Sequence, residues 1–307
     1  MLDVSILIVN WNGKDLLTRC IQAVQETVKQ VSYEIIVIDN NSSDGSQAML
    51  RADYPDVVLI ENADNTGFAH ANNQGMEIAQ GRYMLLLNSD AFVEDNTIDS
   101  MVAFMDAHLE AGMSGCKLLY EDRRLQPSAY SFPTLATELY FALQLNALFP
   151  KSREFGKFAM TWWDFNDVRE VDAIMGAFML VRREAVAQVG MMDTGYFMYS
   201  EEIDWCYRFR QQGWRILYNP DVVAVHLWGG SSQRVRQEML IQLYRSKVRF
   251  FRKHYGPLSA TLLKGIIGFG ALLRVGPGAL VYLTSGDIHK RDKHRAFVAL
   301  LHATPTF

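Results

Sequence analysis

The sequence has few cysteines, and they are widely spaced along the chain. Cys20, Cys116 and Cys206 are the only three among 307 residues, and no CxxC pair occurs. This argues against a disulfide framework or a zinc knuckle and suits a reducing compartment. The N-terminus lacks a basic stretch, and the apolar run at 6–9 is too short for a signal peptide. We therefore interpret this run as part of a first strand.

A glycine-rich dinucleotide fingerprint is also missing. The first apolar run is followed by NWNGKD at 10–15, which lacks the glycines that let a pyrophosphate approach a helix N-terminus. The segment GIIGFG at 265–270 lies in an apolar region with no strand before it. A classical NAD site is therefore not expected.

Acidic residues are scarce in the last quarter of the chain. Residues 234–307 contain thirteen Lys/Arg and three Asp/Glu, whereas the whole chain has a formal net charge of −4. This segment therefore carries about +10 and the remainder about −14. A basic tail on an acidic body indicates an anionic partner, either nucleic acid or a membrane with anionic lipids. A solvated basic helix face is the alternative.

The first 120 residues alternate between apolar runs and amphipathic segments. Strands are predicted at 4–10, 33–39, 56–61 and 82–88, and helices at 15–24, 46–54, 68–80 and 96–108. Near-continuous apolar strands separated by helices predict an α/β fold with a mostly parallel central sheet covered by helices on both faces. Ligands bind such sheets at the carboxyl ends of the strands.

After about residue 120 the pattern loosens. A helix is predicted at 132–150, a loop at 157–173 and a helix with a basic face at 238–255. The apolar segment 257–284 is interrupted by Lys264 and Arg274, so its uninterrupted stretches are too short to span a bilayer and a surface-lying amphipathic segment is expected. We expect a nucleotide-binding half at about 1–120 and an acceptor half at about 121–233, which together form one domain (1–233), and a helical basic and apolar tail at 234–307.

Two of the predicted strands end in acidic side chains. Asp39 ends the second strand, where its carboxylate could accept hydrogen bonds from a ribose hydroxyl or a base N–H, and Asp44 follows within DNNSSDG. A turn and a helix cap are the alternative. Asn88, Ser89 and Asp90 end the fourth strand, and Asp90 could hold a divalent cation that also binds a diphosphate. A capped turn is the alternative there.

Three further candidates lie far along the chain. His226 follows the strand-like run VVAV and could complete a site for Mn²⁺ or Mg²⁺, with Mn²⁺ the better match to mixed N/O ligands, or serve a structural role. Glu201 and Glu202 stand near a helix start, where the helix dipole stabilises acids, and one of them could act as a general base toward a hydroxyl. Arg208 lies one turn beyond Asp204, and we expect a structural pair.

Six segments follow one another in a telling order: VSILIVNWNG, YEIIVIDNNSSDGS, NTGFAHANNQGMEIAQGRYMLLLNSD, GAFMLVRREA, YFMYSEEIDWCYRFRQQGW and VVAVHLWGGSS. Together they resemble the family 2 inverting glycosyltransferases of the GT-A fold. The rhamnosyltransferase-like branch, which builds bacterial surface polysaccharides, matches best. The resemblance covers about residues 3–232.

The resemblance implies a nucleotide pocket at the carboxyl edge of the sheet. Asp39 would hold the base or ribose of the nucleotide. The other positions assigned to the nucleotide are Val9, Asn10, Asp44, Asn65, Gly67, Phe68, Asn73, Asn88 and Ser89.

The resemblance also implies a metal and a base. The family's DxD motif, commonly NxD in this branch, reads Asn88-Ser89-Asp90, so Asp90 would be the principal metal carboxylate and His226 a further ligand. The family's Glu-Asp pair reads Glu201-Glu202 here. Glu202 would therefore be the base, on an arm one methylene longer, with Glu201 in reserve.

The implied reaction is a single displacement with inversion. Glu202 would remove the proton of an acceptor hydroxyl, whose oxygen attacks the anomeric carbon as the nucleotide diphosphate leaves. The donor would be dTDP-rhamnose, or a UDP-sugar of another hexose, and the acceptor a lipid-linked or polysaccharide glycan. We expect peripheral contact with the inner face of the cytoplasmic membrane and no nucleic-acid partner. Candidates to stack on sugar or base, or to be core residues, are Trp162, Trp163, Trp205 and Trp228.

Two alternatives stay open. A sugar nucleotidyltransferase also uses an α/β sheet with carboxylate-held Mg²⁺, but it needs a glycine-rich basic loop after the first strand, which NWNGKD matches poorly. A non-catalytic, membrane-docked module that binds nucleotide sugars is the second alternative, because the Glu-Asp pair is altered.

Overall fold

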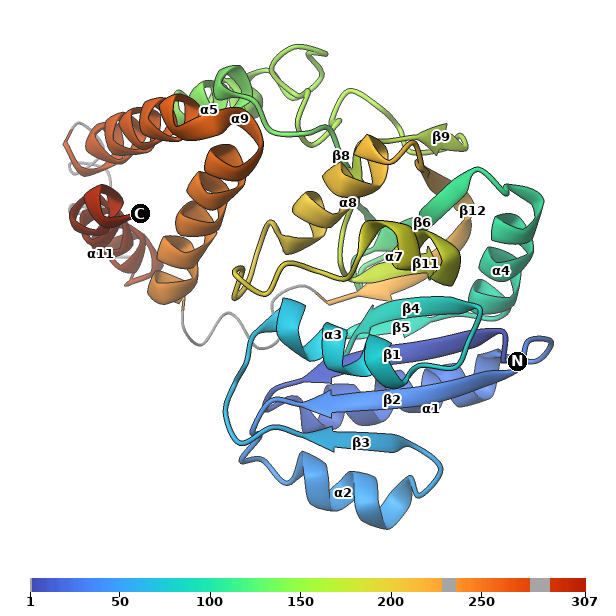
Figure 1. Ribbon diagram of the computed structural model, residues 1–307. Coiled ribbons are helices and arrows are strands. Elements are labelled where there is room, and N and C mark those ends of the chain that lie inside the picture. Colours follow the sequence, from blue (N-terminus) through green and yellow to red (C-terminus); the bar gives the residue numbers. More distant parts are fainter. Residues whose placement is uncertain (1, 228–235, 277–287) are drawn as a thin grey trace. The chain divides into compact units, whose positions relative to one another are not determined.

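The computed structural model describes residues 2–227, 236–276 and 288–307 (Figure 1). The chain divides into two compact units. The first comprises residues 1–131, 164–197 and 201–231, and the second comprises residues 132–163, 198–200 and 232–307. The domain limits expected from the motifs, at 1–233 and 234–307, remain a prediction.

A ten-stranded sheet forms the centre of the first unit. Its main order is β3-β2-β1-β4-β11-β6-β12-β5, with β7 paired to β6 and β9 to β12. The strands are β1 (Val4–Asn10), β2 (Tyr33–Asp39), β3 (Val58–Glu61), β4 (Tyr83–Asn88), β5 (Ala91–Val93), β6 (Ala111–Leu119), β7 (Leu125–Gln126), β9 (Arg169–Glu170), β11 (Phe178–Arg182) and β12 (Arg215–His226). The pairs β1–β2, β1–β4, β2–β3 and β6–β12 are parallel and include the longest pairings of this mixed sheet. A separate two-stranded sheet joins β8 (Ala129–Tyr130) and β10 (Ala173–Ile174).

The helices of the first unit follow the predicted alternation. They are α1 (Lys14–Thr27), α2 (Ser46–Asp53), α3 (Phe68–Ile78), α4 (Thr97–Ala107), α7 (Arg183–Val189) and α8 (Glu201–Gln211). All four predicted strands and all four predicted helices of the first 120 residues are present, with their ends shifted by three residues or fewer.

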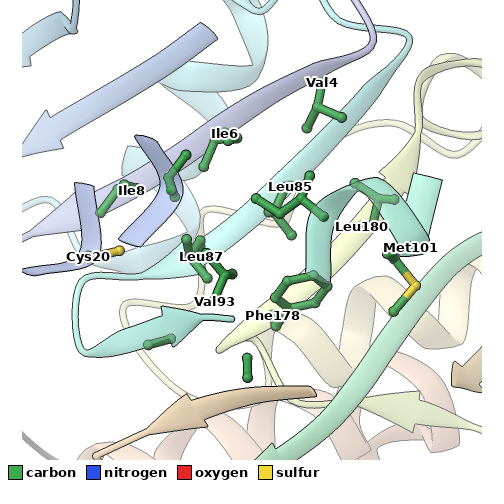
Figure 2. Close-up of a cluster of buried hydrophobic side chains, with 14 of the residues drawn as sticks. Val4, Ile6, Ile8, Cys20, Leu85, Leu87, Val93, Met101, Phe178 and Leu180 are labelled. Atoms are coloured by element: carbon green, nitrogen blue, oxygen red, sulfur yellow. The ribbon is translucent and has the colours of Figure 1, made fainter. Parts of the chain in front are cut away.

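The main core lies between one face of the sheet and helices α1 and α4. Ile6 and Leu85 point from neighbouring parallel strands into a cluster that includes Cys20 of α1 and Met101 of α4 (Figure 2). These side chains are fully buried. Their alternation along the strands explains why every second residue of β1 belongs to this cluster.

The opposite face of the same strands is covered by α3. A Cβ atom at Gly75 would lie 2.9 Å from Cδ1 of Ile38 and 3.1 Å from Cδ2 of Leu7, so the helix approaches the sheet closely there. Helices therefore cover both faces of the parallel strands, and the predicted α/β layering is confirmed.

The helix predicted at 132–150 is wrong as a single element. The second unit instead has α5 (Leu135–Ala142) and the short α6 (Leu145–Leu148). Between them Gln144 has φ of 59°, a left-handed conformation that ends α5.

The C-terminal segment forms the helices of the second unit. These are α9 (Arg236–Val275), α11 (Ile288–Ala303) and the 3₁₀ helix η2 (Thr304–Thr306). Gly256, with φ of 87° and ψ of 170°, is not helical, so α9 consists of two helical segments joined by a kink directly before Pro257. Within the described residues, one helix, Gln237–Val275, is long and apolar enough by length and composition to cross a membrane. The expectation that the apolar stretches between its charged residues are too short to span a bilayer stays a prediction. Length and composition alone do not separate a membrane span from a core helix.

A buried ion pair joins α5 to α9 within the second unit. Nζ of Lys247 lies 2.9 Å from both carboxylate oxygens of Glu138, whose side chain is 3% exposed. Burial works to lower the pKa of Lys247, but the charge of Glu138 outweighs it, so the pKa is raised. The two charges depend on each other, because either one alone would be buried without a counter-ion.

We expect Lys247→Met to lower the free energy of unfolding of this unit by about 3 kcal/mol, because it leaves Glu138 buried without its cation. The double variant Glu138→Leu/Lys247→Met should recover most of this loss. Chemical denaturation followed by circular dichroism measures both. A single substitution that costs no more than the double variant would contradict the interpretation.

Candidate active site

The tips of three strands meet at one edge of the sheet. In the parallel register Asn10 of β1 lies opposite Asp39 of β2, and Val9 lies opposite Asn88 of β4. The carboxyl ends of β1, β2 and β4 thus bring together polar side chains that are far apart in the sequence. This edge is the place where ligands bind in sheets of this kind.

Asp39 holds the loop that follows β2. Its side chain is fully buried; Oδ2 accepts a hydrogen bond from Nδ2 of Asn10 (2.8 Å). Oδ1 accepts hydrogen bonds from the backbone N–H of Ser42 (2.8 Å) and from Nε2 of Gln47 (2.7 Å). Its carboxylate therefore organises the edge of the sheet, and its contact with a nucleotide stays a prediction.

Asn10 presents a polar atom at the same edge. Its Oδ1 is buried and has no hydrogen-bond partner within the described part of the chain. A Cβ atom at Gly13 would lie 3.0 Å from this oxygen and 3.7 Å from Oγ of Ser89, so a side chain at position 13 would crowd the oxygen. A buried acceptor of this kind is usually satisfied by a partner that is not part of the chain.

Asp44 acts as a cap between two helices. Its Oδ2 accepts a hydrogen bond from the N–H of Lys14 (2.8 Å) at the start of α1, and its Oδ1 accepts hydrogen bonds from the N–H and hydroxyl of Ser46 at the start of α2. Burial works to raise the pKa of Asp44, but these hydrogen bonds outweigh it and lower the pKa. The observed contacts are those of the turn-and-cap alternative, and the nucleotide role of Asp44 remains a prediction.

The turn before α3 is built around Gly67. Its φ is 82°, and a Cβ atom there would lie 2.3 Å from the carbonyl oxygen of Phe197, so only glycine fits. Oδ1 of Asn65 accepts a hydrogen bond from the N–H of Gly67 (3.1 Å), and the N–H of Phe68 donates to the oxygen of Phe197 (2.9 Å). These contacts fix where α3 begins.

Asn73 joins α3 to the segment after α7. Its Nδ2 donates to the carbonyl of Met192 (2.9 Å), and its Oδ1 accepts from the N–H of the same residue (3.0 Å). Both ends of the amide therefore fix the backbone at position 192. A nucleotide contact by Asn73 stays a prediction.

Asp90 and His226 come together from β-strands distant in sequence. Nε2 of His226 lies 3.2 Å from Oδ1 of Asp90 and 3.4 Å from Nδ2 of Asn88. His226 ends β12, which pairs with β5 directly after Asp90, so that His226 lies opposite Ala91. Both side chains are largely buried, with 7% and 13% of their surface exposed.

The second ring nitrogen of His226 is held by a residue that the motifs did not indicate. Nδ1 lies 2.8 Å from Oε1 of the fully buried Gln126, which therefore accepts a hydrogen bond from Nδ1–H. In that tautomer the lone pair of Nε2 faces Asp90. A carboxylate oxygen and an imidazole nitrogen this close suit a divalent cation with mixed N/O ligands.

This donor set is small. Among the residues that the structure describes, no group of three or more His, Cys, Asp or Glu side chains could hold a metal ion. Two protein ligands still fit the expected cation, because such ions commonly bind one or two protein side chains together with phosphate oxygens.

The two acids at the start of α8 differ in their surroundings. Glu201 is buried, and its Oε2 has no hydrogen-bond partner among the described residues. Burial, followed by the charge of Glu202, raises the pKa of Glu201 well above its usual value. Tyr199 and Ser200, directly before the helix, both have positive φ (68° and 65°), a strained backbone of the kind found at functional sites. A raised pKa favours the protonated carboxyl, which cannot accept a proton, so Glu202 is the better candidate.

Gly176 connects Glu202 to the start of α3. A Cβ atom at Gly176 would lie 3.4 Å from the ring of Phe68 and 3.9 Å from Cβ of Glu202. The N–H of Asn88 donates to the carbonyl of the next residue, Ala177 (3.1 Å). The candidate base and the strand tip that carries Asn88 therefore flank the same short segment.

Two other expectations about α8 are resolved by the structure. Nε of Arg208 lies 3.0 Å from Oδ2 of Asp204, as expected for a structural pair. Trp205 is fully buried and donates a hydrogen bond to the carbonyl of Gly190 (2.8 Å), so it is a core residue and does not stack on a ligand. Trp163 is also buried, and Trp228 lies outside the described residues.

Sequence reasoning missed the residues that support the site. Gln126, Gly176 and Tyr130, whose pKa is raised by burial and by the charge of Glu202, lie on short strands or turns without a helix or strand period. The one available signal was the polar Gln126 between the apolar Leu125 and Pro127.

Solved structures with the same architecture include two glycosyltransferases. The mannosyltransferase PcManGT from Pyrobaculum calidifontis, in complex with GDP-Man and Mn²⁺, has a TM-score of 0.56 at 18% identity and covers 100% of this chain and 88% of its own. GalNAc-T7 with UDP, GalNAc and Mn²⁺ has a TM-score of 0.57 at 17% identity and covers 100% and 57%. These likenesses establish the GT-A fold.

The sequence comparisons establish the family. The profile described as Glycosyl transferase family 2 matches residues 5–190, and the chain belongs to this family. N-acetylglucosaminyl-diphospho-decaprenol L-rhamnosyltransferase of Mycobacterium tuberculosis is 27% identical over 74% of this chain and 79% of its own length. Rhamnosyltransferase WbbL of Escherichia coli K12 is 27% identical over 73% and 83%. The predicted family is confirmed, and the nucleotidyltransferase alternative is set aside.

The raised pKa of Glu201 predicts a pH-dependent stability. Its protonated form stabilises the fold below the pKa of the unfolded chain, and this contribution is lost as pH rises toward the folded pKa. Glu201→Gln should therefore gain stability relative to the parent between pH 5 and pH 8, by more than about 1 kcal/mol, the free energy of a shift of one pKa unit. Thermal and chemical unfolding at the two pH values measure this.

A matched control is Glu184→Gln, an exposed acid in the first turn of α7. Its stability difference from the parent should be the same at both pH values. A Glu201→Gln difference that is equally flat would show that Glu201 is charged in the fold.

Proposed function

We propose that the protein transfers a hexose, with inversion, from a nucleotide diphosphate to a hydroxyl of a lipid-linked or polysaccharide acceptor. The proposed donor is dTDP-rhamnose, from which L-rhamnose is transferred, and a UDP-linked hexose is the second choice. The observation that supports the proposal best is the meeting of Asp90 and His226 at the sheet edge whose neighbouring segment, Gly176–Ala177, also flanks Glu202. The names of the two rhamnosyltransferase relatives support the donor and acceptor.

The nucleotide would bind at the tips of β1 and β2. Oδ1 of Asn10 is a buried acceptor for a ribose hydroxyl or a base N–H. The carboxylate of Asp39 accepts hydrogen bonds from Asn10 and Ser42. Its unused lone pairs would accept hydrogen bonds from the nucleotide. The ring of Phe68 and the half-buried Val9 would cover the base or ribose.

Asp90 and His226 would hold a divalent cation, Mn²⁺ or Mg²⁺, together with the donor diphosphate. The ion would supply positive charge that stabilises the leaving diphosphate. Gln126 keeps the Nε2 lone pair of His226 directed toward this position, which makes it a positioning residue. Asn88 is uncharged, and its Nδ2 lies 3.4 Å from Nε2 of His226.

Glu202 would accept the proton of the acceptor hydroxyl. A general base has to be ionised before it accepts a proton, and the raised pKa of Glu201 favours its neighbour for that task. Glu202 is the less buried residue of the pair, which lowers the cost of a charge there, although its Oε2 is buried. Attack by the hydroxyl oxygen in line with the leaving diphosphate would invert the anomeric centre.

We also propose that residues 234–307 contact a membrane and that the enzyme works at the inner face of the cytoplasmic membrane. The support is the basic charge of this segment and the apolar α9. A lipid-linked acceptor would be presented at that surface.

The base assignment predicts that Glu202→Gln lowers kcat by about 10²–10⁴-fold, because the amide cannot accept the proton. The KM for the nucleotide sugar should change little. Steady-state transfer from dTDP-rhamnose, with UDP- and GDP-sugars in parallel, measures both quantities. Glu201→Gln is the matched variant and should lose less than about tenfold, because an amide resembles the neutral acid.

The reverse result, a large loss in Glu201→Gln and a small one in Glu202→Gln, would move the base to Glu201. Unchanged turnover in both variants would favour the non-catalytic binding module.

The metal assignment predicts that Asp90→Asn weakens Mn²⁺ binding in the presence of nucleoside diphosphate by more than about tenfold. The electron paramagnetic resonance signal of free Mn²⁺ measures this directly, without turnover. Asp122→Asn, an exposed carboxylate paired with Arg124, is the control and should bind Mn²⁺ like the parent. Unchanged Mn²⁺ affinity and transfer in Asp90→Asn would refute the site.

A further inference from the structure

The second half of α9, from Pro257 to Val275, has two unlike faces. On one face Ala260, Leu263, Ile267 and Ala271 are 4% exposed or less. They lie on the side of α9 that faces α5 and α11 across a small cavity lined by all three helices. This face is the packed side of the second unit.

The other face is apolar and bare. Leu258, Leu262, Phe269 and Leu272 are 72%, 50%, 46% and 58% exposed. Their positions, with the exposed Gly265 between them, follow steps of four, three, four and three residues, so they form one stripe along the helix. We name these four side chains the α9 stripe.

No charge interrupts the α9 stripe. The second half of α9 has two charged residues, and both bond to neighbouring backbone: Nζ of Lys264 donates to the carbonyl of Pro305 (3.3 Å), and Arg274 donates to the carbonyls of Phe141 and Ala142 (both 3.0 Å). Arg274 thereby caps the end of α5. An exposed stripe of large apolar side chains without charge marks an interaction surface.

The first half of α9 is basic, in contrast to the apolar stripe. Arg245, Arg249, Arg252 and Lys253 are all exposed, and Glu238 is the only acid of the whole helix. The basic segment adjoins the apolar stripe across the kink at Gly256, and the two together are complementary to a bilayer that has anionic headgroups above its acyl chains.

We propose that the α9 stripe inserts into the headgroup–acyl boundary of an anionic bilayer, with α9 lying in the plane of the membrane. This rests on the membrane contact proposed above and specifies its surface and its depth. The packed face excludes a crossing by α9 alone, because that face is already covered by α5 and α11. A crossing would also bring Lys264 toward the middle of the hydrocarbon layer, where a charge is costly.

The test is flotation of the full chain with vesicles of 70% phosphatidylcholine and 30% phosphatidylglycerol. The variant Leu258→Gln/Leu262→Gln/Phe269→Gln/Leu272→Gln should lose at least tenfold in vesicle partitioning, while its circular dichroism and unfolding transition stay those of the parent. Pure phosphatidylcholine or 0.5 M NaCl should weaken the parent, because the basic half of α9 then lacks its counter-charge.

A matched four-site control uses apolar residues of similar exposure in the first unit, Val58, Ile78, Leu109 and Val168, at 41%, 45%, 72% and 46%. Their replacement by Gln should leave partitioning within twofold of the parent. A stripe variant that floats as well as this control would overturn the proposal.

Two further outcomes would also overturn it. Retention of the parent in vesicles after carbonate extraction at pH 11 would mean that the helix crosses the bilayer. Self-association of the parent in analytical ultracentrifugation, lost in the stripe variant and without flotation of either protein, would assign the stripe to a second copy of the chain. Sugar transfer to a water-soluble acceptor is measured in parallel without vesicles, so a failure here stays distinct from a failure of the proposed transferase activity.

Discussion

The site depends on the parallel register of β2, β1 and β4. This register places Asn10 beside Asp39 and Val9 beside Asn88, which brings three strand tips to one edge. Side chains alternate between the two faces of a strand, so a slip by one residue would turn the tips away from each other. It would also exchange the residues of β1 that pack against α1 and α4 with those that pack against α3. The packing of Ile6 and Leu85 against α1 and α4 opposes such a slip. The apolar core therefore fixes the polar geometry.

The sequence contained most of the N-terminal architecture because its signals are local. Apolar runs bounded by turn residues predicted β1, β2 and β4 to within one residue. The partners of His226 could not be predicted that way, because Gln126 is 100 residues distant and its strand has two residues. The break at Gln144 was equally hidden, since no glycine or proline marks its left-handed conformation.

Polar residues at the edge divide into those that hold its backbone in place and those that could contact a ligand. The side chains of Asp44 and Asn73 form hydrogen bonds with backbone groups. The positions that the family motif groups with Asp39 therefore include residues with structural contacts. The buried Oδ1 of Asn10 is different, because it has no hydrogen-bond partner within the described residues, and Asp90 and His226 place a carboxylate beside an imidazole. The likeness to the family thus identifies the edge, and the hydrogen bonds distinguish the tasks within it.

The two acids of α8 show why a changed motif need not change the chemistry. Burial and the neighbouring charge of Glu202 raise the pKa of Glu201, which favours Glu202 as the ionised member of the pair. Replacing an aspartate by Glu202 lengthens the side chain by one methylene and keeps the carboxylate. Membrane docking by α9 would also favour the reaction, because an acceptor confined to the same membrane surface has a raised effective concentration near the enzyme.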